Sequence, residues 1–195
     1  LTLCTRGILL EAGHLVFDGT PLEARNKYVT QAAGTRYSVE GNTARGGSGG
    51  ARIQELWFNV RDQHDRHVAT IETGSPLSIC LRANVEMAYQ DRRDMEVAFG
   101  IDSLDGQRLY TVLSSWNLDE VRVDGSEIRV SCDLDSVPLV PGKYLISASM
   151  LFRGDTLDSI QHCAAFDVIP RARSIHVERL HGWGPLDMPC HFRNL

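Results

Sequence analysis

The chain has 195 residues, 43% of them hydrophobic, which is enough for the core of one domain and an appendage. Its net charge of −5 and pI near 5.8 argue against a polyanion-binding surface, so we expect no nucleic-acid partner. Five dispersed cysteines without a CxxC pair indicate reduced thiols in a cytoplasmic protein, and seven histidines show no convincing zinc spacing. We therefore expect neither a metal nor a cofactor.

The first residues predict a β-hairpin followed by a capped helix. Apolar runs at 8–10 and 15–17 flank a Gly-bearing turn, which is typical of two short paired strands. Thr20 is then expected to cap a helix, with Pro21 at its first position and Glu23 three residues after the cap. This order of hairpin, DG-x-P and acidic residue resembles the last segment of an ABC transporter ATPase domain. No Gly-x-x-x-x-Gly-Lys-Ser/Thr loop occurs in the sequence, so we expect no ATP hydrolysis by this chain.

Three regions follow from composition and from this resemblance. Residues 1–31 are expected to be the C-terminal remnant of an ATPase domain, which fits a truncated chain that starts at Leu1. Residues 32–51 are rich in Gly, Thr, Ser and Ala, and this composition predicts a flexible linker. Residues 52–195 are expected to form the main domain.

The main domain reads as a series of strands. Hydrophobic residues alternate with polar ones, for example at 77, 79, 81, 83 and 85, and a period of two indicates half-buried strands. Expected strands span 53–60, 68–72, 76–85, 95–101, 109–113, 127–134, 142–152 and 164–169, with further candidates at 174–177 and 190–195. DG and PG turns separate them without any useful helical periodicity. The pattern predicts an all-β domain with an immunoglobulin-like antiparallel β-sandwich, or alternatively a jelly-roll-like one.

Several motifs carry a more specific resemblance. Pro141-Gly142 precedes Tyr144 in the pattern L-x-P-G-x-Y-x-I/L, a GSPLSI segment occupies 74–79, and an F-x-V pattern occupies 166–168. Together with the ATPase-like start, these motifs resemble the ATPase subunit of an O-antigen polysaccharide exporter of the Wzt type. The resemblance covers nearly the whole chain outside the linker.

That family suggests a function for the sandwich. The resemblance implies a non-catalytic carbohydrate-binding module that recognises the capped residue at the non-reducing end of a finished O-antigen polysaccharide. Recognition would couple chain completion to export through a membrane-embedded ABC permease, on the cytoplasmic side of the inner membrane. The resemblance also implies a homodimer that exchanges a terminal strand, for which 190–195 is the candidate.

Two other classes stay open from the residues themselves. One is a purely structural dimerisation module that holds two ATPase domains together without affinity for sugar. The other is a glycoside hydrolase using Asp133 and Asp135, although acidic residues beside a turn are common for local structural reasons.

Sugar recognition needs an aromatic ring for the C–H face of a pyranose and planar polar groups for its hydroxyls. Small outward residues at Ala98 and Gly100 are expected to hollow one sheet face and let a ring approach. The candidate carbohydrate-binding residues are Trp116, Tyr110, Ser147, Ser149, Arg153 and His162 near that face, and Arg82 and Asn84 on another strand.

Overall fold

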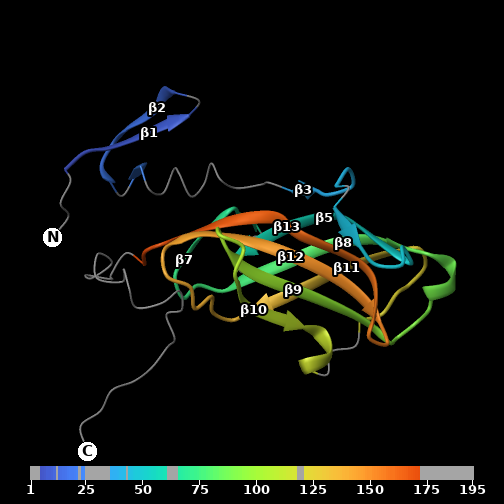
Figure 1. Ribbon diagram of the computed structural model, residues 1–195. Helices are drawn as coiled ribbons and strands as arrows, with labels where there is room; N and C mark the ends of the chain where they lie inside the picture. The colour runs from blue at the N-terminus through green and yellow to red at the C-terminus, as the bar shows by residue number, and fades with distance from the viewer. Residues whose placement is uncertain are drawn as a thin grey trace, which may run out of the picture.

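The computed structural model describes residues 5–11, 13–21, 23–24, 36–42, 44–60, 66–117 and 121–171 (Figure 1). Apart from the start of the capped helix near residue 21 and two short 3-10 turns, η1 (Met87–Tyr89) and η2 (Ser114–Asn117), the regular elements of these residues are strands. The strands are β1 (Gly7–Glu11), β2 (His14–Gly19), β3 (Tyr37–Ser38), β4 (Arg45–Gly46), β5 (Ala51–Val60), β6 (Arg66–His67), β7 (Thr70–Glu72), β8 (Leu77–Val85), β9 (Met95–Ser103), β10 (Arg108–Leu113), β11 (Glu127–Leu134), β12 (Gly142–Phe152) and β13 (Asp155–Ile169).

The strands of the main domain form two stacked sheets (Figure 1). The first sheet has the order β10-β9-β12-β13-β4, and β7 also pairs with β13. The second sheet has the order β11-β8-β5-β3, and β6 also pairs with β5. All described pairs are antiparallel except β7 with β13, which is parallel. This arrangement confirms the predicted β-sandwich.

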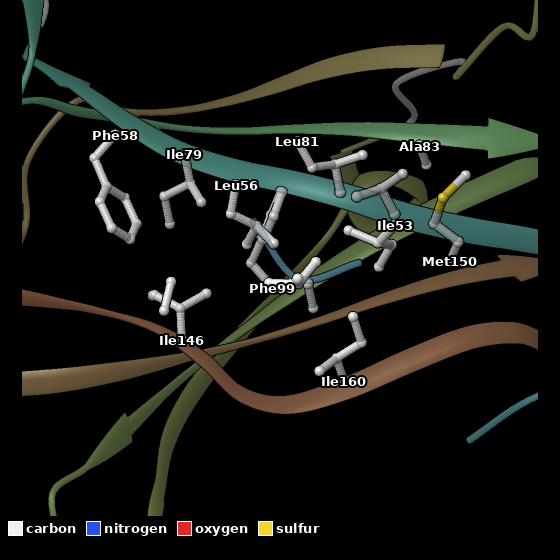
Figure 2. Packing of buried hydrophobic residues seen from close by; sticks show 14 of the residues in the cluster. Ile53, Leu56, Phe58, Ile79, Leu81, Ala83, Phe99, Ile146, Met150 and Ile160 are labelled. Carbon is white, nitrogen blue, oxygen red and sulfur yellow. The ribbon is translucent and has the colours of Figure 1, made fainter. Parts of the chain in front are cut away.

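The core lies between the two sheets and follows the alternation of the sequence. Figure 2 shows Phe58 and Ile79 of the second sheet facing Phe99 and Ile146 of the first. Each of these side chains is at most 1% exposed. Burying a side chain of this size stabilises a fold by roughly 1.5–3 kcal/mol, so the alternating apolar faces explain why the sheets stack.

The hairpin and its helix cap form as the sequence predicts. β1 and β2 pair antiparallel, with one register shift near Leu10. The backbone N–H of Glu23 donates to Thr20 Oγ1 at 3.3 Å, and the backbone N–H of Thr20 donates to Glu23 Oε2 at 3.0 Å. These reciprocal bonds are those of a capping box.

The expectation of an unstructured linker at 32–51 is wrong for its described residues. β3 joins the second sheet beside β5, and β4 joins the first sheet beside β13. At Gly47 the absence of a side chain allows a close backbone approach. Gly47 has φ +112°, and a Cβ at this position would lie 2.6 Å from the carbonyl oxygen of Leu157. Only glycine fits such a position, which composition alone does not distinguish from a flexible run.

Arg45 fastens this segment to the sandwich. Its Nη1 donates to Asp158 Oδ2 at 2.6 Å, and its Nη2 donates to the carbonyl oxygens of Val39 and Ile53. The backbone N–H of Ile53 also donates to Asp158 Oδ2, at 2.7 Å. The side chains of Arg45 and Asp158 are only 10% and 4% exposed, so this ion pair is part of the domain interior.

β13 is longer than predicted, because the expected strand at 164–169 already begins at Asp155. Its first half carries several polar residues, and a register shift against β12 interrupts the alternation between Ile160 and Ala164. A bulge of this kind removes the period of two that a sequence reading depends on. The candidate swapped strand at 190–195 lies outside the described residues.

The thiol of Cys163, in this bulge, is expected to make the stability of the domain depend on pH in the alkaline range. Burial raises the pKa of its thiol from an ordinary value of 9.0 to about 11, and Sγ donates to the carbonyl oxygen of Ile146 at 3.3 Å. Because the unfolded chain loses this proton first, the contribution of Cys163 to stability is complete below pH 9 and declines as the pH rises to 11. The decline amounts to at most about 3 kcal/mol.

Urea titrations at several pH values between 8 and 11 measure this decline. We expect Cys163→Ala to unfold with a shallower dependence on pH than the wild type over this range. Equal slopes for the two proteins would show that the thiol makes no such contribution.

Candidate functional site

The outer face of the first sheet holds the most developed polar site among the described residues. Along β9 the outward positions are Ala98, Gly100 and Asp102, and Ser147 of β12 pairs with Gly100. The small residues lower the middle of this face, as the sequence predicts. Asp102 lies on the outward side, yet it is only 1% exposed because polar neighbours cover it.

These neighbours form what we call the Asp102 cluster: Asp102, Arg108, Ser147, Gln161 and His162. The Nε of Arg108 donates to Asp102 Oδ1, and Ser147 Oγ lies 2.7 Å from Asp102 Oδ2. Gln161 Oε1 is 3.1 Å from Ser147 Oγ and accepts from Arg108 Nη2 at 3.4 Å. The cluster therefore joins β9, β10, β12 and β13 into one hydrogen-bonded surface.

His162 reaches the cluster because β13 bulges. The register passes from Ile146↔Ala164 to Ala148↔Ile160, so three residues of β13 lie opposite Ser147. His162 sits in this bulge with φ +49°, its backbone N–H donates to Ser147 Oγ at 3.1 Å, and its Nε2 lies 3.6 Å from Asp102 Oδ2. Bulges re-aim side chains, and this one directs an imidazole onto the sheet face.

Arg108 lies flat on Gly100. A Cβ added to Gly100 would collide with Cζ, Nη1 and Nη2 of Arg108, and Cζ would be the nearest of the three atoms. Because the central carbon is nearer than either nitrogen, the face of the guanidinium group covers the glycine rather than its edge. The Arg108 side chain as a whole is 41% exposed.

Three predicted residues belong to this region. Ser147 and His162 are members of the cluster, and Ser149 follows one outward position along β12, where its Oγ is 2.8 Å from Ser159 Oγ. Tyr110 does not belong to it, which corrects the prediction. The ring of Tyr110 packs against the core, and its hydroxyl is buried without a hydrogen-bond partner among the described residues. Burial raises the pKa of this hydroxyl.

Trp116 and Arg153 lie near the opposite end of β9. Trp116 is 68% exposed in η2, and its neighbour Ser115 donates to Glu96 Oε2 at 3.1 Å. Arg153 pairs with Asp94 at 2.7 Å and follows directly after β12. Glu96 and Asp102 are six residues apart, which is about 20 Å along a strand, so these residues do not share one pocket with the Asp102 cluster.

Arg82 and Asn84 lie on the outer face of the second sheet, away from the cluster. Arg82 pairs with Glu55 at 3.2 Å and with Glu127 at 3.2 Å. A hydrogen bond from Arg82 lowers the pKa of Glu55, and the bond from Arg129 is the main cause that lowers the pKa of Glu127. On the same face, the guanidinium group of Arg36 lies 4.9 Å from the ring centroid of Trp57. These side chains form a separate polar network on the second sheet, away from the Asp102 cluster.

Sequence reasoning missed Asp102, Arg108 and Gln161. The signal for Asp102 was present, because the outward alternation through Ala98 and Gly100 continues to it. The predicted strand ends at 101, two residues before the end of β9, and the next predicted strand begins at 109, one residue after Arg108. Gln161 lies in the bulged part of β13, for which the alternation gives no indication.

A pocket of about 470 Å³ opens between β10 and β11, at the edge of the sandwich. Its apolar wall includes Val97, Phe99, Val112 and Val130, and Arg122 and Arg129 lie among its polar groups. It is separate from the Asp102 cluster and shares no lining residue with it. Within the part of the chain that the structure describes, no group of three or more His, Cys, Asp or Glu side chains could hold a metal ion.

A family model and several solved structures resemble this chain. The Wzt C-terminal domain family matches residues 42–182. The crystal structure of the C-terminal domain of wzt has a TM-score of 0.63 and 19% identity, covering 80% of this chain and 90% of that one. A Niemann-Pick type C2 protein from Japanese carpenter ant has a TM-score of 0.39 and 9% identity, covering 65% of this chain and 96% of that one. The DNA glycosylase AlkC from Pseudomonas fluorescens has a TM-score of 0.35 and 14% identity, covering 62% and 31%.

Among curated protein sequences, none matches this chain significantly. The family match covers well over half of the chain, and the crystal structure shares its fold. The domain of this family is non-catalytic and associated with O-antigen ABC exporters. The chain belongs to the Wzt C-terminal domain family.

Proposed function

We propose that this chain binds the terminal, capped residue of an O-antigen polysaccharide on the outer face of its first sheet. One observation carries the proposal: four strands bring an Asp, an Arg, a Gln, a His and a Ser into one hydrogen-bonded surface around a carboxylate that is 1% exposed. Such a surface is fixed before a ligand arrives, and this reduces the entropy cost of binding.

The geometry suits one end of a polymer. The polar groups of the Asp102 cluster match the hydroxyls of a terminal sugar, and Trp116 offers an exposed ring about 20 Å further along the sheet. A chain whose end occupies the cluster would pass toward Trp116 and Arg153. These two residues would then contact internal sugars rather than the cap.

In the full-length protein, recognition would signal that a chain is complete and ready for export. We propose that residues 1–31 end an ATPase domain, and that the sandwich, which includes β3 and β4, works as a homodimer with a membrane-embedded permease at the inner membrane. Among the described residues, no helix has the length and apolar character needed to cross a membrane.

Calorimetric titration of the purified chain tests the proposal. The probes are the O-polysaccharide of the source strain, intact and after exoglycosidase trimming of its non-reducing end. We expect the intact polymer to bind at least 10-fold more tightly than the trimmed one. Equal affinity for both, or no binding of either, would contradict the proposal, and a dimer without sugar affinity would favour a structural dimerisation module instead.

A matched pair of variants identifies the face that binds. Gln161→Ala removes an amide from the Asp102 cluster and is expected to weaken binding about 10-fold or more. Asn84→Ala removes an exposed amide from the second sheet and is expected to leave the affinity unchanged. The reverse result would assign binding to the second sheet.

A further inference from the structure

We propose that Arg108 is the floor of the sugar site and that the group it recognises is uncharged. The proposal rests on the proposed function and adds the chemical class of the ligand end. Arginine beside a ligand is commonly a clamp for phosphate or carboxylate, which it binds through the N–H groups along its edge. The contacts of Arg108 leave it little capacity for that role.

The N–H groups of Arg108 are already engaged. A guanidinium group has five N–H donors. Hydrogen bonds run from Nε and Nη2 to Asp102, from Nη2 to Gln161 and from Nη1 to Thr111, which accounts for four of the five. A bidentate bond to an incoming anion needs two free, adjacent N–H groups, and only one N–H remains.

The charge of Arg108 is also balanced within the cluster. Asp102 offsets it, so Arg108 and Asp102 together carry no net charge. Next to the cluster, a Cβ on Gly106 would lie 3.3 Å from His162 Cε1, so the turn that contains Asp105 adjoins the site. A hydrogen bond from Ser103 lowers the pKa of Asp105, which keeps this carboxylate ionised. An anionic cap would therefore meet the negative charge of Asp105, while the charge of Arg108 is already paired with Asp102.

What Arg108 does offer is a flat surface. Gly100 supports one face of the guanidinium group, and bonds around the edge hold the plane in place. Guanidinium groups are weakly hydrated and stack through their faces, as aromatic rings do. Since Tyr110 points into the core, this exposed plane takes the place that an aromatic ring was predicted to fill. A sugar ring lying on it would direct its hydroxyls toward Gln161 and His162.

Two substitutions test whether the sugar ring lies on the guanidinium plane of Arg108. Arg108→Lys keeps the charge but removes the plane, and Gly100→Ala lifts the plane because its Cβ would collide with the guanidinium group. We expect each variant to bind the intact polysaccharide at least 10-fold more weakly. Gly46→Ala, in β4 of the same sheet, is the control, because a Cβ at that position would meet nothing within 4 Å. Melting temperatures show whether each variant folds, and Arg108→Lys remains informative if Gly100→Ala does not.

Two measurements on the wild type test the absence of charge in the ligand. Raising NaCl from 50 to 500 mM is expected to change the Kd less than about threefold, and 10 mM inorganic phosphate is expected not to displace the polysaccharide. Displacement by phosphate, or full affinity in Arg108→Lys, would overturn this inference while leaving the proposed function intact. A wild type that binds no polysaccharide would instead contradict the proposed function itself.

Discussion

Arg45→Met is expected to lower the free energy of unfolding by about 3–5 kcal/mol, because it leaves the carboxylate of Asp158 buried without its cation. Asp158 is 4% exposed and would keep only the N–H of Ile53 as a donor among the contacts described above. The variant also removes the hydrogen bonds from Arg45 to the backbone carbonyl groups of Val39 and Ile53, although Val39 keeps the N–H of Asn42 as a donor at 3.1 Å. Each of these lost hydrogen bonds adds to the cost.

Chemical denaturation measures this loss, and Arg129→Met is the matched control. Arg129 pairs with Glu127 at 3.0 Å, but the two side chains are 69% and 39% exposed. Surface pairs of this kind contribute at most about 1 kcal/mol, so the control should stay close to the wild type. If Arg45→Met were equally mild, the segment from β3 to β4 would not be an integral part of the sandwich.

This segment also shows where sequence reasoning fails for the fold. The alternation of apolar residues in β5, β8, β9 and β12 predicts their inward faces, because every second residue must enter the core. A glycine in the sequence does not indicate in the same way whether its segment is flexible or tightly packed. The run Gly46–Gly50 has the composition of a linker, but Gly47 lies against the backbone of Leu157 and Gly50 against the ring of Tyr89. Whether a glycine is needed depends on the residue that packs against it, and here that residue lies about 40 to 110 positions further along the chain.

In the candidate site, too, some residues could be predicted from the sequence and others could not. The place of Ser147 could be predicted, because small outward residues in β9 and β12 point to one face. The same alternation would include Asp102 if the predicted strand extended one residue further. The role of Arg108 could not be predicted, because its position depends on the absence of a side chain at Gly100 in the neighbouring strand. The bulge that presents His162 likewise exists only in the pairing of β12 with β13.

Breaking the ion pair of Asp102 and Arg108 is expected to cause the second large loss of folding stability. Arg108→Met is expected to lower the free energy of unfolding by about 3 kcal/mol, because Asp102 stays buried after its cation is lost. The value lies at the low end for a buried pair because 41% of the Arg108 side chain is exposed. Adding Asp102→Asn removes the unpaired charge, so the double variant should recover more than half of the loss.

A double-mutant cycle by chemical denaturation measures this coupling, with Asp94 and Arg153 as the matched control pair. These two residues form a comparable ion pair at 2.7 Å near the other end of β9, but both are largely exposed. Their cycle of Asp94→Asn and Arg153→Met should show a coupling below about 1 kcal/mol. A double variant of Asp102 and Arg108 no more stable than Arg108→Met would mean that the buried carboxylate does not depend on this arginine. In that case Ser147 and His162 would be its main support, and the guanidinium group would lie over Gly100 without being held there by charge.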